Sequence, residues 1–337
     1  MRAIVQRAYG EPEDVLSLQD IDTPTIKDDE ILVRVQAASV HPDVWHVATG
    51  RPYVLRLMGS GVRRPKNRVP GTDVSGVVES AGASVTQFKR GDEVFGECVK
   101  GYQWVNGGAY AEYAVVRPDW IALKPSNATF EQAASVPTSG IIALSGLRNQ
   151  GKLEAGQKVL INGAGGGVGL LAVQIAKAYG AEVTAVDDTA RQDVLRSAGA
   201  DRVIDYAQQD FTQSGERYDL ILDIPGNHPF SRIKSALTPD GTYVLIAHDG
   251  YGQSGGKWFG SIPKVLALMA RTPFSRHMPK SGFSMPDKRE SMAVLRELME
   301  AGKITPIVGK TFPLAEAPEA IRYLADGRAV GRVVLTV

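Results

Sequence analysis

The stretch Lys158–Asp187 constrains the fold of this chain more than any other part of the sequence. A short apolar run at Val159–Asn162 predicts a buried strand, which leads into a glycine cluster followed by apolar residues at helical spacing. We expect Gly180 to end that helix, and a second strand, Glu182–Val186, to lead into an acidic residue. A strand, a glycine turn, a helix and a strand in this order predict half of a dinucleotide-binding fold.

The glycine turn predicts a site for a pyrophosphate group. Glycine adopts backbone angles closed to other residues, and its missing Cβ lets a phosphate and a helix approach the main chain closely. The N-terminus of the following helix offers free N–H groups and the positive end of its dipole. A glycine-rich loop in some other α/β protein is the alternative interpretation. The predicted cofactor-binding residues of the turn are Gly163, Ala164, Gly165, Gly166, Gly167 and Val168.

Composition limits the remaining possibilities. The 337 residues are enough for two domains, and the net charge of +1 gives no overall electrostatic attraction to nucleic acid or to an anionic membrane. Cys98 is the single cysteine, which excludes a disulfide framework and any multi-cysteine metal site. We see no signal peptide and no apolar run near the ~20 residues of a membrane span. We therefore expect a cytoplasmic enzyme with no nucleic-acid or membrane partner.

The pattern along the chain changes near Thr129. Residues 1–120 contain many short strands with glycine turns, including Ala109–Val116, and predict a small barrel or sandwich. Helices such as Ala190–Ala198 then alternate with strands, which predicts a doubly wound α/β fold. The basic segment Arg271–Met285 is interpreted as a solvated surface, with a role in gating substrate as the alternative. The final strand, Gly331–Val337, is expected to return to the N-terminal β region.

Several segments, in this order and at this spacing, resemble the medium-chain dehydrogenase/reductase superfamily in its zinc-free quinone oxidoreductase branch. The resemblance implies a Rossmann domain at 125–285 and a GroES-like catalytic domain formed by 1–124 and 286–337, with the active cleft between them. Relatives often dimerise through the edge of the Rossmann sheet, so a homodimer is expected. The segments are ASVHPDVWHVATG (38–50), VPGTDVSGVVESAG (69–82), GDEVFG (91–96), GGAYAEYAVV (107–116), INGAGGGVGLLAVQIAKAYGAEV (161–183), GADRVIDY (199–206) and the tail AEAPEAIRYLADGRAVGRVVLTV.

The positions that bind zinc in related enzymes carry other residues in this chain. By the resemblance, zinc-dependent relatives place a cysteine at position 41 and a His-Glu pair at 72–73, where this chain has His41, Thr72 and Asp73. Catalytic zinc requires three N, S or O ligands, and threonine is a poor one. We therefore expect no metal. Without a Lewis acid, hydride transfer to a quinone or an activated C=C bond is favoured over alcohol oxidation.

Residues after the second Rossmann strand give mixed signals on the cofactor. Asp187 and Asp188 stand where an acid hydrogen-bonds the adenosine ribose, which taken alone favours NADH. By the resemblance, Arg191 stands at the position of a phosphate-binding lysine and Tyr206 matches a tyrosine beside the adenosine. We predict NADPH, with NADH possible. The alternatives are that Asp187 only caps a helix and that Arg191 is a solvated helix residue.

Two further contacts with the cofactor are expected. Many relatives carry a threonine where this chain has Ile142, and Thr138, one helical turn earlier, is predicted to replace it. His248 follows a sheet strand, at the end where ligands bind in such folds, and is predicted to approach the nicotinamide. A histidine with no role beyond the loop is the alternative.

The predicted catalytic residues are His41, His46 and Tyr53. By the resemblance, the two histidines flank a segment that the family places at the cleft, and Tyr53 lies in a segment expected to rim it. Histidine titrates near neutral pH, so either one could protonate the oxygen of an enolate or a quinol after hydride transfer. The alternative is that both histidines only shape the pocket while water supplies the proton.

Three functions therefore remain open. The leading prediction is an NAD(P)H-dependent reductase of quinones or α,β-unsaturated carbonyls. A zinc-independent alcohol dehydrogenase would use His41 or His46 as the base. A non-catalytic protein that binds NADPH as a sensor, or that binds RNA or a partner, is the third, since fold alone does not fix function.

Overall fold

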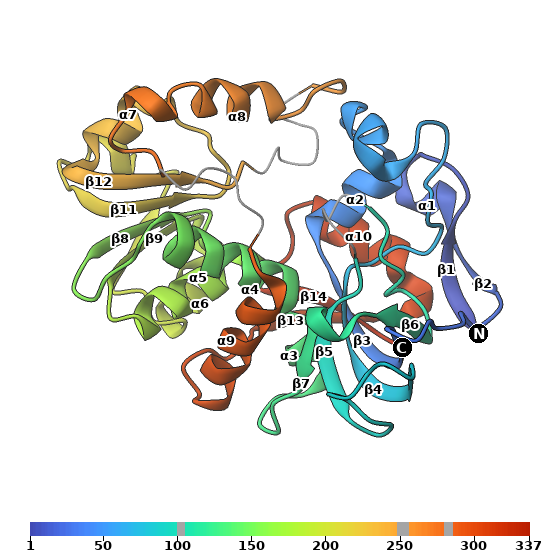
Figure 1. Cartoon of the computed structure of the whole chain (residues 1–337). Coiled ribbons are helices and arrows are strands. Elements are labelled where there is room, and N and C mark those ends of the chain that lie inside the picture. Colours follow the sequence, from blue (N-terminus) through green and yellow to red (C-terminus); the bar gives the residue numbers. More distant parts are fainter. Residues whose placement is uncertain (100–104, 248–255, 280–285) are drawn as a thin grey trace.

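The computed structural model describes residues 1–99, 105–247, 256–279 and 286–337. Within these residues the strands form a five-stranded parallel sheet, a seven-stranded mixed sheet and a two-stranded ribbon. Figure 1 shows the two larger sheets in separate halves of the molecule, with helices packed around each. The expected fold class, a doubly wound domain beside a β-rich domain, is confirmed.

The parallel sheet has the strand order β10-β9-β8-β11-β12. The chain starts at the central strand β8, moves outward to β10, and then crosses back to β11 and β12. Ligands of doubly wound sheets bind at the carboxyl ends of the strands where this reversal occurs, here between β8 and β11. The strands are β8 (Lys158–Asn162), β9 (Glu182–Asp187), β10 (Arg202–Asp205), β11 (Tyr218–Asp223) and β12 (Leu237–Leu245).

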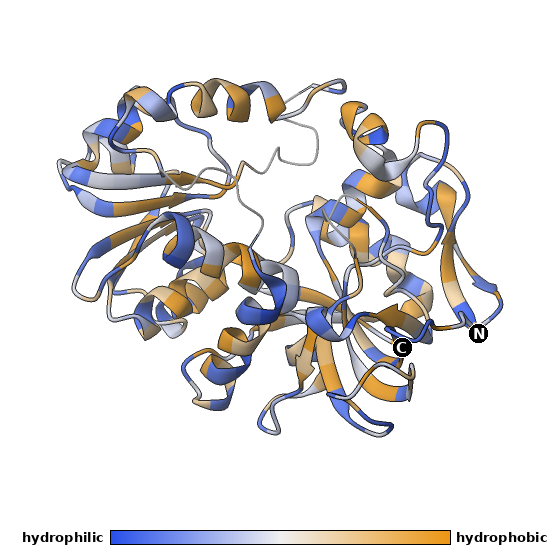
Figure 2. Ribbon diagram, in the orientation of Figure 1, coloured by the Kyte–Doolittle hydropathy of each residue, from blue (hydrophilic) through white to orange (hydrophobic). Residues whose placement is uncertain are grey.

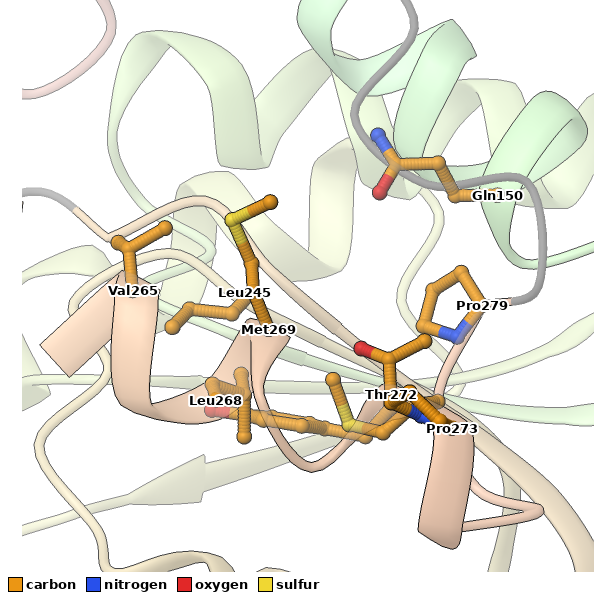
Figure 3. Close-up of a pocket in the computed structure, with 10 residues that line it drawn as sticks. Gln150, Leu245, Val265, Leu268, Met269, Thr272, Pro273 and Pro279 are labelled. Carbon is orange, nitrogen blue, oxygen red and sulfur yellow. The ribbon is translucent and has the colours of Figure 1, made fainter.

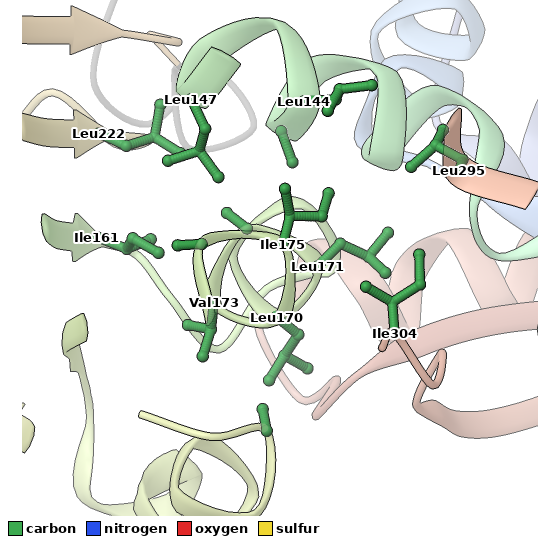
Figure 4. Packing of buried hydrophobic residues seen from close by; sticks show 14 of the residues in the cluster. Leu144, Leu147, Ile161, Leu170, Leu171, Val173, Ile175, Leu222, Leu295 and Ile304 are labelled. Atoms are coloured by element: carbon green, nitrogen blue, oxygen red, sulfur yellow. The ribbon is translucent and has the colours of Figure 1, made fainter. Parts of the chain in front are cut away.

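Helix α5 (Gly167–Ala178) fills the space between this sheet and α4 (Pro137–Leu144). Its apolar face buries Leu171 and Ile175 in one cluster with Leu144 of α4, as Figure 4 shows. Each such side chain contributes roughly 1.5–3 kcal/mol when it leaves water. This packing fixes the N-terminus of α5, and with it the glycine turn, at the edge of the sheet.

The mixed sheet has the order β13-β14-β3-β4-β5-β7, and β6 also pairs with β3. β14 is antiparallel to β3, with Val333 opposite Val40, so the predicted return of the C-terminal strand to the N-terminal region is confirmed. The domain boundaries at 124/125 and 285/286 stay predictions. The strands are β3 (Ile31–Val40), β4 (Asp73–Ala81), β5 (Glu93–Glu97), β6 (Tyr113–Val116), β7 (Ile121–Leu123), β13 (Val308–Pro313) and β14 (Arg332–Thr336), and the ribbon is β1 (Arg2–Gln6) with β2 (Leu16–Asp20).

Helix α9 (Lys288–Glu300) joins the two halves, because it packs on both α4 and β7. The close approach to α4 depends on Gly140, where an added Cβ would lie 2.9 Å from the methyl groups of Leu295. A substitution at Gly140 would therefore require the Leu295 side chain to shift.

The remaining helices lie around the sheets, and Figure 2 shows how apolar and polar residues are distributed along them. Of the helices that the structure describes, none has the length and apolar character that a bilayer crossing requires. These helices are α1 (Pro12–Val15), α2 (Pro42–Thr49), α3 (Phe130–Ala134), α6 (Gln192–Ser197), α7 (Phe230–Ser235), α8 (Ile262–Met269) and α10 (Ala317–Ala325).

Strand β6 is shorter than the expected strand Ala109–Val116. Before it begins, the main-chain N–H of Tyr110 donates to the carbonyl of Pro70 over 3.0 Å and the Tyr110 carbonyl accepts from Ile4 over 2.9 Å, so this part of the chain pairs with a loop and with β1. The expected helix Ala190–Ala198 is also divided, into a 3-10 turn at Thr189–Arg191 and α6.

Candidate dinucleotide site and active site

The glycine turn follows β8 as the sequence predicts. Gly163 has a φ of +80°, and its N–H and that of Ala164 both donate to the carbonyl of Val186, over 3.0 and 3.1 Å. A Cβ on Gly169 would lie 2.4 Å from the Gly163 carbonyl oxygen, so glycine there lets α5 pack against the turn. The turn is thus held between the ends of β8 and β9.

The N-terminus of α5 can accept a phosphate. Gly166 is the N-cap residue, and an added Cβ there would meet only the Gly163 carbonyl oxygen, 3.8 Å away. The first N–H groups of a helix have no intrahelical acceptor, and the helix dipole adds positive potential at the same place. The turn therefore fits the pyrophosphate of a dinucleotide, with main-chain N–H groups as donors.

Asp187, at the end of β9, is tied to this turn. Its side chain is buried, its Oδ2 accepts a hydrogen bond from the N–H of Gly165 over 2.6 Å, and its Oδ1 accepts one from the N–H of Asp188 over 2.9 Å. Burial raises the pKa of the Asp187 carboxyl above its ordinary value, although these hydrogen bonds and the charge of Arg191 oppose the shift. The acid therefore holds the turn in place.

Arg191 lies across the glycine turn. A Cβ on Gly165 would lie 2.1 Å from the Cδ of Arg191, which shows how closely the side chain covers the turn. Its guanidinium pairs with Asp188 and donates to the carbonyls of Gly327 and Ala329, over 2.7 and 3.1 Å. Arg191 thus links the nucleotide-binding sheet to the loop that precedes β14.

Tyr206 lies beside the same acids. Its main-chain N–H donates to the carbonyl of Asp187 over 3.2 Å, and its side chain is exposed. Partial burial, followed by the charges of Asp188 and Asp187, raises the pKa of the phenol. The structure therefore brings together Asp187, Asp188, Arg191 and Tyr206, the four residues predicted for the adenosine end of the cofactor.

Arg332, at the start of β14, was not predicted from the sequence. A Cβ on Gly167 would lie 2.4 Å from its Cδ and 2.6 Å from its Nη1, so the guanidinium lies against the N-terminus of α5. Its Nη2 donates to Ser39 over 2.7 Å and lies 3.5 Å from a carboxylate oxygen of Asp73. A single arginine opening an otherwise apolar strand was the only sequence signal. Its position against the glycine turn depends on the pairing of β14 with β3.

Thr138 belongs to a buried polar cluster. Its hydroxyl lies 2.5 Å from Oδ1 of Asp73 and 2.8 Å from Oε1 of Glu97, and its main-chain N–H donates to Asp73 over 3.3 Å. Glu97 is paired in turn with Lys288 of α9. In this structure the Thr138 side chain joins strands of the mixed sheet to α4, and its predicted contact with the cofactor stays a prediction.

His41 has the geometry of a proton donor or acceptor. It caps α2, is 5% exposed, and its Nδ1 lies 2.7 Å from a carboxylate oxygen of Asp43. Nδ1 can donate to this carboxylate or accept from the main-chain N–H of Asp43, 3.3 Å away, and in either case Nε2 is the ring nitrogen that remains for a ligand. Nε2 has no hydrogen-bond partner within the residues that the structure describes. A buried polar atom without a partner is costly, which marks this atom for a ligand.

His46 and Tyr53 have defined surroundings of their own. Nδ1 of His46 lies 2.8 Å from the carbonyl of Arg51, and because a carbonyl only accepts, Nδ1 carries the proton. The main-chain N–H of Tyr53 donates to the carbonyl of Lys257 over 2.8 Å, and its ring meets that of Trp258 edge-to-face at 5.1 Å. Tyr53 thus lies where the N-terminal region meets residues 256–259.

His248, which was predicted to approach the nicotinamide, lies outside the described residues.

The described residues do not fit a catalytic zinc ion. No group of three or more His, Cys, Asp and Glu side chains within them could hold a metal. Asp73, at a position where zinc-dependent relatives carry a ligand, accepts a hydrogen bond from Ser39 over 2.8 Å and pairs with Arg332. Its carboxylate is therefore already engaged.

An apolar cavity lies apart from the predicted site residues. It measures about 230 Å³, is lined mainly by apolar side chains of α8, β12 and the segment after α8, and is shown in Figure 3. None of the predicted site residues that the structure describes lines it.

Comparison with known proteins agrees with this architecture. Residues 27–126 match the alcohol dehydrogenase GroES-like domain, and residues 198–335 match a family described as zinc-binding dehydrogenase. The chain is 33% identical to NADPH-dependent alkenal/one oxidoreductase of Arabidopsis thaliana, over 99% of this chain and 79% of that protein. It is 28% identical to human quinone oxidoreductase, over 99% of this chain and 97% of that one. The structure of quinone oxidoreductase from Coxiella burnetii superposes with a TM-score of 0.83 at 29% identity, covering 100% of this chain and 99% of that one.

The fold and the site define a nicotinamide-dependent oxidoreductase of two domains. The chain belongs to the medium-chain dehydrogenase/reductase superfamily, in its quinone oxidoreductase-like branch.

Proposed function

We propose that this protein reduces a quinone or an α,β-unsaturated carbonyl with NADPH, without a metal. The observation that carries the proposal is His41, whose buried Nε2 has no partner among the described residues while Asp43 holds its Nδ1. An orphaned imidazole nitrogen of this kind can deliver a proton to an oxygen that becomes negative after hydride transfer. The names of the relatives, an alkenal/one oxidoreductase and a quinone oxidoreductase, support this substrate class.

Different residues of the chain bind the cofactor and supply the proton in the proposed reaction. The bound nicotinamide supplies the hydride. The turn after β8 and the N-terminus of α5 hold the pyrophosphate through main-chain N–H groups, and Arg332, against Gly167, adds a positive charge there. Asp43 orients His41, and with a proton on both ring nitrogens Nε2 donates one of them to the substrate oxygen, which leaves a neutral imidazole. His46 and Tyr53 border the same region from α2 and the segment after it.

The proposed preference for NADPH over NADH rests on the hydrogen bonds and charges of Asp187 and Arg191. Main-chain N–H groups already occupy both carboxylate oxygens of Asp187, which leaves it less able to bind the ribose hydroxyls. Arg191 carries a charge that a 2′-phosphate would draw away from the carbonyls of Gly327 and Ala329. Tyr206 provides an exposed ring beside them for the adenosine.

The test is turnover by purified protein, treated with a chelator and checked for metal content. We expect oxidation of NADPH with a quinone or an enone as acceptor, at a lower kcat/KM with NADH and without loss of activity after chelation. Oxidation of simple alcohols by the metal-free protein, with no reduction of either acceptor class, would favour the alcohol dehydrogenase alternative. Tight NADPH binding with no turnover of any of these would favour a non-catalytic role.

The resemblance also leads us to propose a cytoplasmic homodimer. β12 is an edge strand of the parallel sheet, but its Tyr243 N–H already donates to the carbonyl of His277 over 2.7 Å. A partner would therefore meet this edge beside the segment that contains His277. Sedimentation equilibrium gives the mass, and a monomer at micromolar concentration would contradict the dimer.

A further inference from the structure

We propose that one face of this protein binds the surface of a membrane that contains anionic lipids. The face consists of residues 56–68 and 256–276 and is called here the basic-apolar face. It combines exposed apolar side chains with unpaired positive charges, the combination by which peripheral proteins bind an anionic bilayer without crossing it.

The first segment of the face, residues 56–68, presents both kinds of side chain. Leu57 is 74% exposed, and Met58 and Val62 are exposed as well. Its exposed cations are Arg63, Arg64, Lys66 and Arg68. These cations line a hollow of about 430 Å³ formed by residues 61–68, large enough for a phosphate or carboxylate headgroup.

The second segment, residues 256–276, repeats the combination. Phe274 is 91% exposed and Trp258 is 67% exposed, and Phe259, Leu266 and Met269 are exposed beside them. Its exposed cations are Lys257, Lys264, Arg271 and Arg276. Figure 3 shows Val265 and Leu268 of α8 at the apolar cavity, whereas Leu266 of the same helix is exposed. α8 therefore has apolar side chains on more than the face that packs inward.

The two segments meet at one junction. The N–H of Val54 donates to the carbonyl of Trp258 over 3.0 Å, next to the matching bond from Tyr53 to Lys257. The guanidinium of Arg56 stacks on the ring of Tyr53, 4.6 Å from its centre, and so anchors the first segment at this junction. In Figure 1, α8 and the helical segment after α2 lie along the same upper side of the molecule, and Figure 2 shows apolar residues on both.

The concentration of apolar residues here is unusual for this protein. Eight of the eleven exposed large hydrophobic residues within the described part of the chain lie on these two segments. Scattered exposed apolar residues need no explanation, but a contiguous group of this size marks an interaction site. Trp and Phe are among the side chains that favour the boundary between headgroups and acyl chains.

The charges identify the occupant as anionic. No Asp or Glu occurs between residues 54 and 72 or between 250 and 286, and none of the eight exposed cations pairs with an acid within the described residues. The whole chain carries a net charge of only +1, so the rest of the protein is net acidic. The small net charge therefore does not reveal the positive potential at the basic-apolar face. This potential acts over about one Debye length of ~8–10 Å.

Charge and apolar exposure also favour a lipid surface over two other possible occupants of the face, a second copy of the chain and a nucleic acid. Two copies that met through this face would bring cations toward cations with no acid on the face to pair them, which is unfavourable. A nucleic acid would use the cations and stack on Trp258 or Phe259, but it would leave the aliphatic side chains of Leu57, Val62 and Leu266 exposed. An anionic bilayer engages both the cations and the aliphatic groups.

The test is co-sedimentation of the full chain with vesicles of phosphatidylcholine alone and with phosphatidylserine added as one third of the lipid. We expect binding only to the vesicles with phosphatidylserine, weakened by salt. A quadruple variant, Arg64→Gln, Lys66→Gln, Lys264→Gln and Arg271→Gln, should reduce the partition coefficient by roughly 1,000-fold. A matched quadruple variant, Lys27→Gln, Lys89→Gln, Lys234→Gln and Lys303→Gln, has the same net charge and should bind nearly as well as the parent.

The apolar part is tested with a second variant, Leu266→Ser with Phe274→Ser, which should lower vesicle binding at every salt concentration. Circular dichroism and thermal melting establish that each variant is folded. Equal effects of the two quadruple variants, or binding that ignores phosphatidylserine, overturns the proposal. Absence of vesicle binding also overturns it. In that case a dimer broken by Leu266→Ser with Phe274→Ser would assign the face to a second copy, and capture of an RNA oligonucleotide would assign it to nucleic acid.

Discussion

The main-chain N–H of Gly165 donates a hydrogen bond to Oδ2 of Asp187, with 2.6 Å between nitrogen and oxygen. The bond joins the turn after β8 to the end of β9, so the shape of the pyrophosphate site depends on a side chain from the neighbouring strand. The acid that the sequence assigns to the ribose therefore has a structural role as well.

This relationship predicts how stability depends on pH in an Asp187→Asn variant. Burial raises the pKa of Asp187 in the folded protein above its ordinary 3.8, so folding favours the neutral form. The parent protein should lose stability as pH rises from below 3.8 through the raised pKa, whereas asparagine has no charge to acquire. We expect the melting temperature of the variant minus that of the parent to increase by roughly 2 °C as the pH rises from 4 to 7. Melting curves of the cofactor-free proteins measure this gain, and a constant difference would contradict it.

Arg191 is predicted to determine the choice between the two dinucleotides. Arg191→Gln should raise the KM for NADPH about 10-fold, the loss of one charge-assisted contact, and change the KM for NADH less than 2-fold. Arg196→Gln is the matched control, because Arg196 forms only exposed contacts with Asp193 and Gln192 of the preceding turn within the described residues. Steady-state kinetics with both cofactors gives the answer. Equal losses for NADPH and NADH would mean that Arg191 acts only by holding the turn.

Arg332 is predicted to strengthen binding of both dinucleotides alike. Its guanidinium lies beside Gly167 and cannot distinguish the adenosine ends, so Arg332→Gln should weaken NADH and NADPH by a similar factor of about 10. Arg328→Gln, which removes an exposed arginine paired with Asp326, should leave both affinities unchanged. Fluorescence titration of the folded variants measures the dissociation constants. A selective effect on NADPH would be inconsistent with a position at the pyrophosphate.

The polar cluster around Thr138 is predicted to stabilise the fold. Thr138→Val keeps the shape of the side chain but removes the hydroxyl that lies between Asp73 and Glu97, which should cost about 3 kcal/mol. Ser139, the next residue, is also buried, yet its hydroxyl has no partner within the described residues, so Ser139→Ala should be neutral or stabilising. Urea unfolding of both variants provides the comparison. Similar losses at the two positions would show that helix packing, and not the cluster, sets the stability.

His41 is predicted to carry the proton. His41→Gln should lower kcat about 100-fold while the affinity for the cofactor stays within 2-fold. Asp43→Asn should lower kcat less, because it weakens only the bond that orients the ring. His46→Gln serves as the comparison, since its Nδ1 is bound to the carbonyl of Arg51. A kcat unchanged by His41→Gln would assign the proton to water.

Some predicted residues have neighbours in the folded chain that lie far from them in the sequence. The glycine turn is local, and it was placed correctly because strand, turn and helix follow one another within a single stretch. Thr138 was expected at the cofactor from its position on a helix, yet the structure places its hydroxyl against Asp73 and Glu97 on two strands distant in the chain. Arg271 and Arg276 of the basic-apolar face lie in the segment Arg271–Met285, which was interpreted as an ordinary solvated surface, because the exposure of the neighbouring apolar residues is known only after packing.

The sequence by itself determined the Rossmann unit and the β-rich region, because hydrophobic periodicity and glycine spacing act over short distances, and the resemblance of several segments to a known family indicated the superfamily. It also placed Asp187, Asp188 and Arg191 at the end of one strand. Only the tertiary structure decided that Arg332, from the far end of the chain, lies against Gly167 and that residues 53 and 54 meet 257 and 258. These contacts arise from the pairing of β14 with β3 and from the docking of the two halves. No local pattern encodes such pairings.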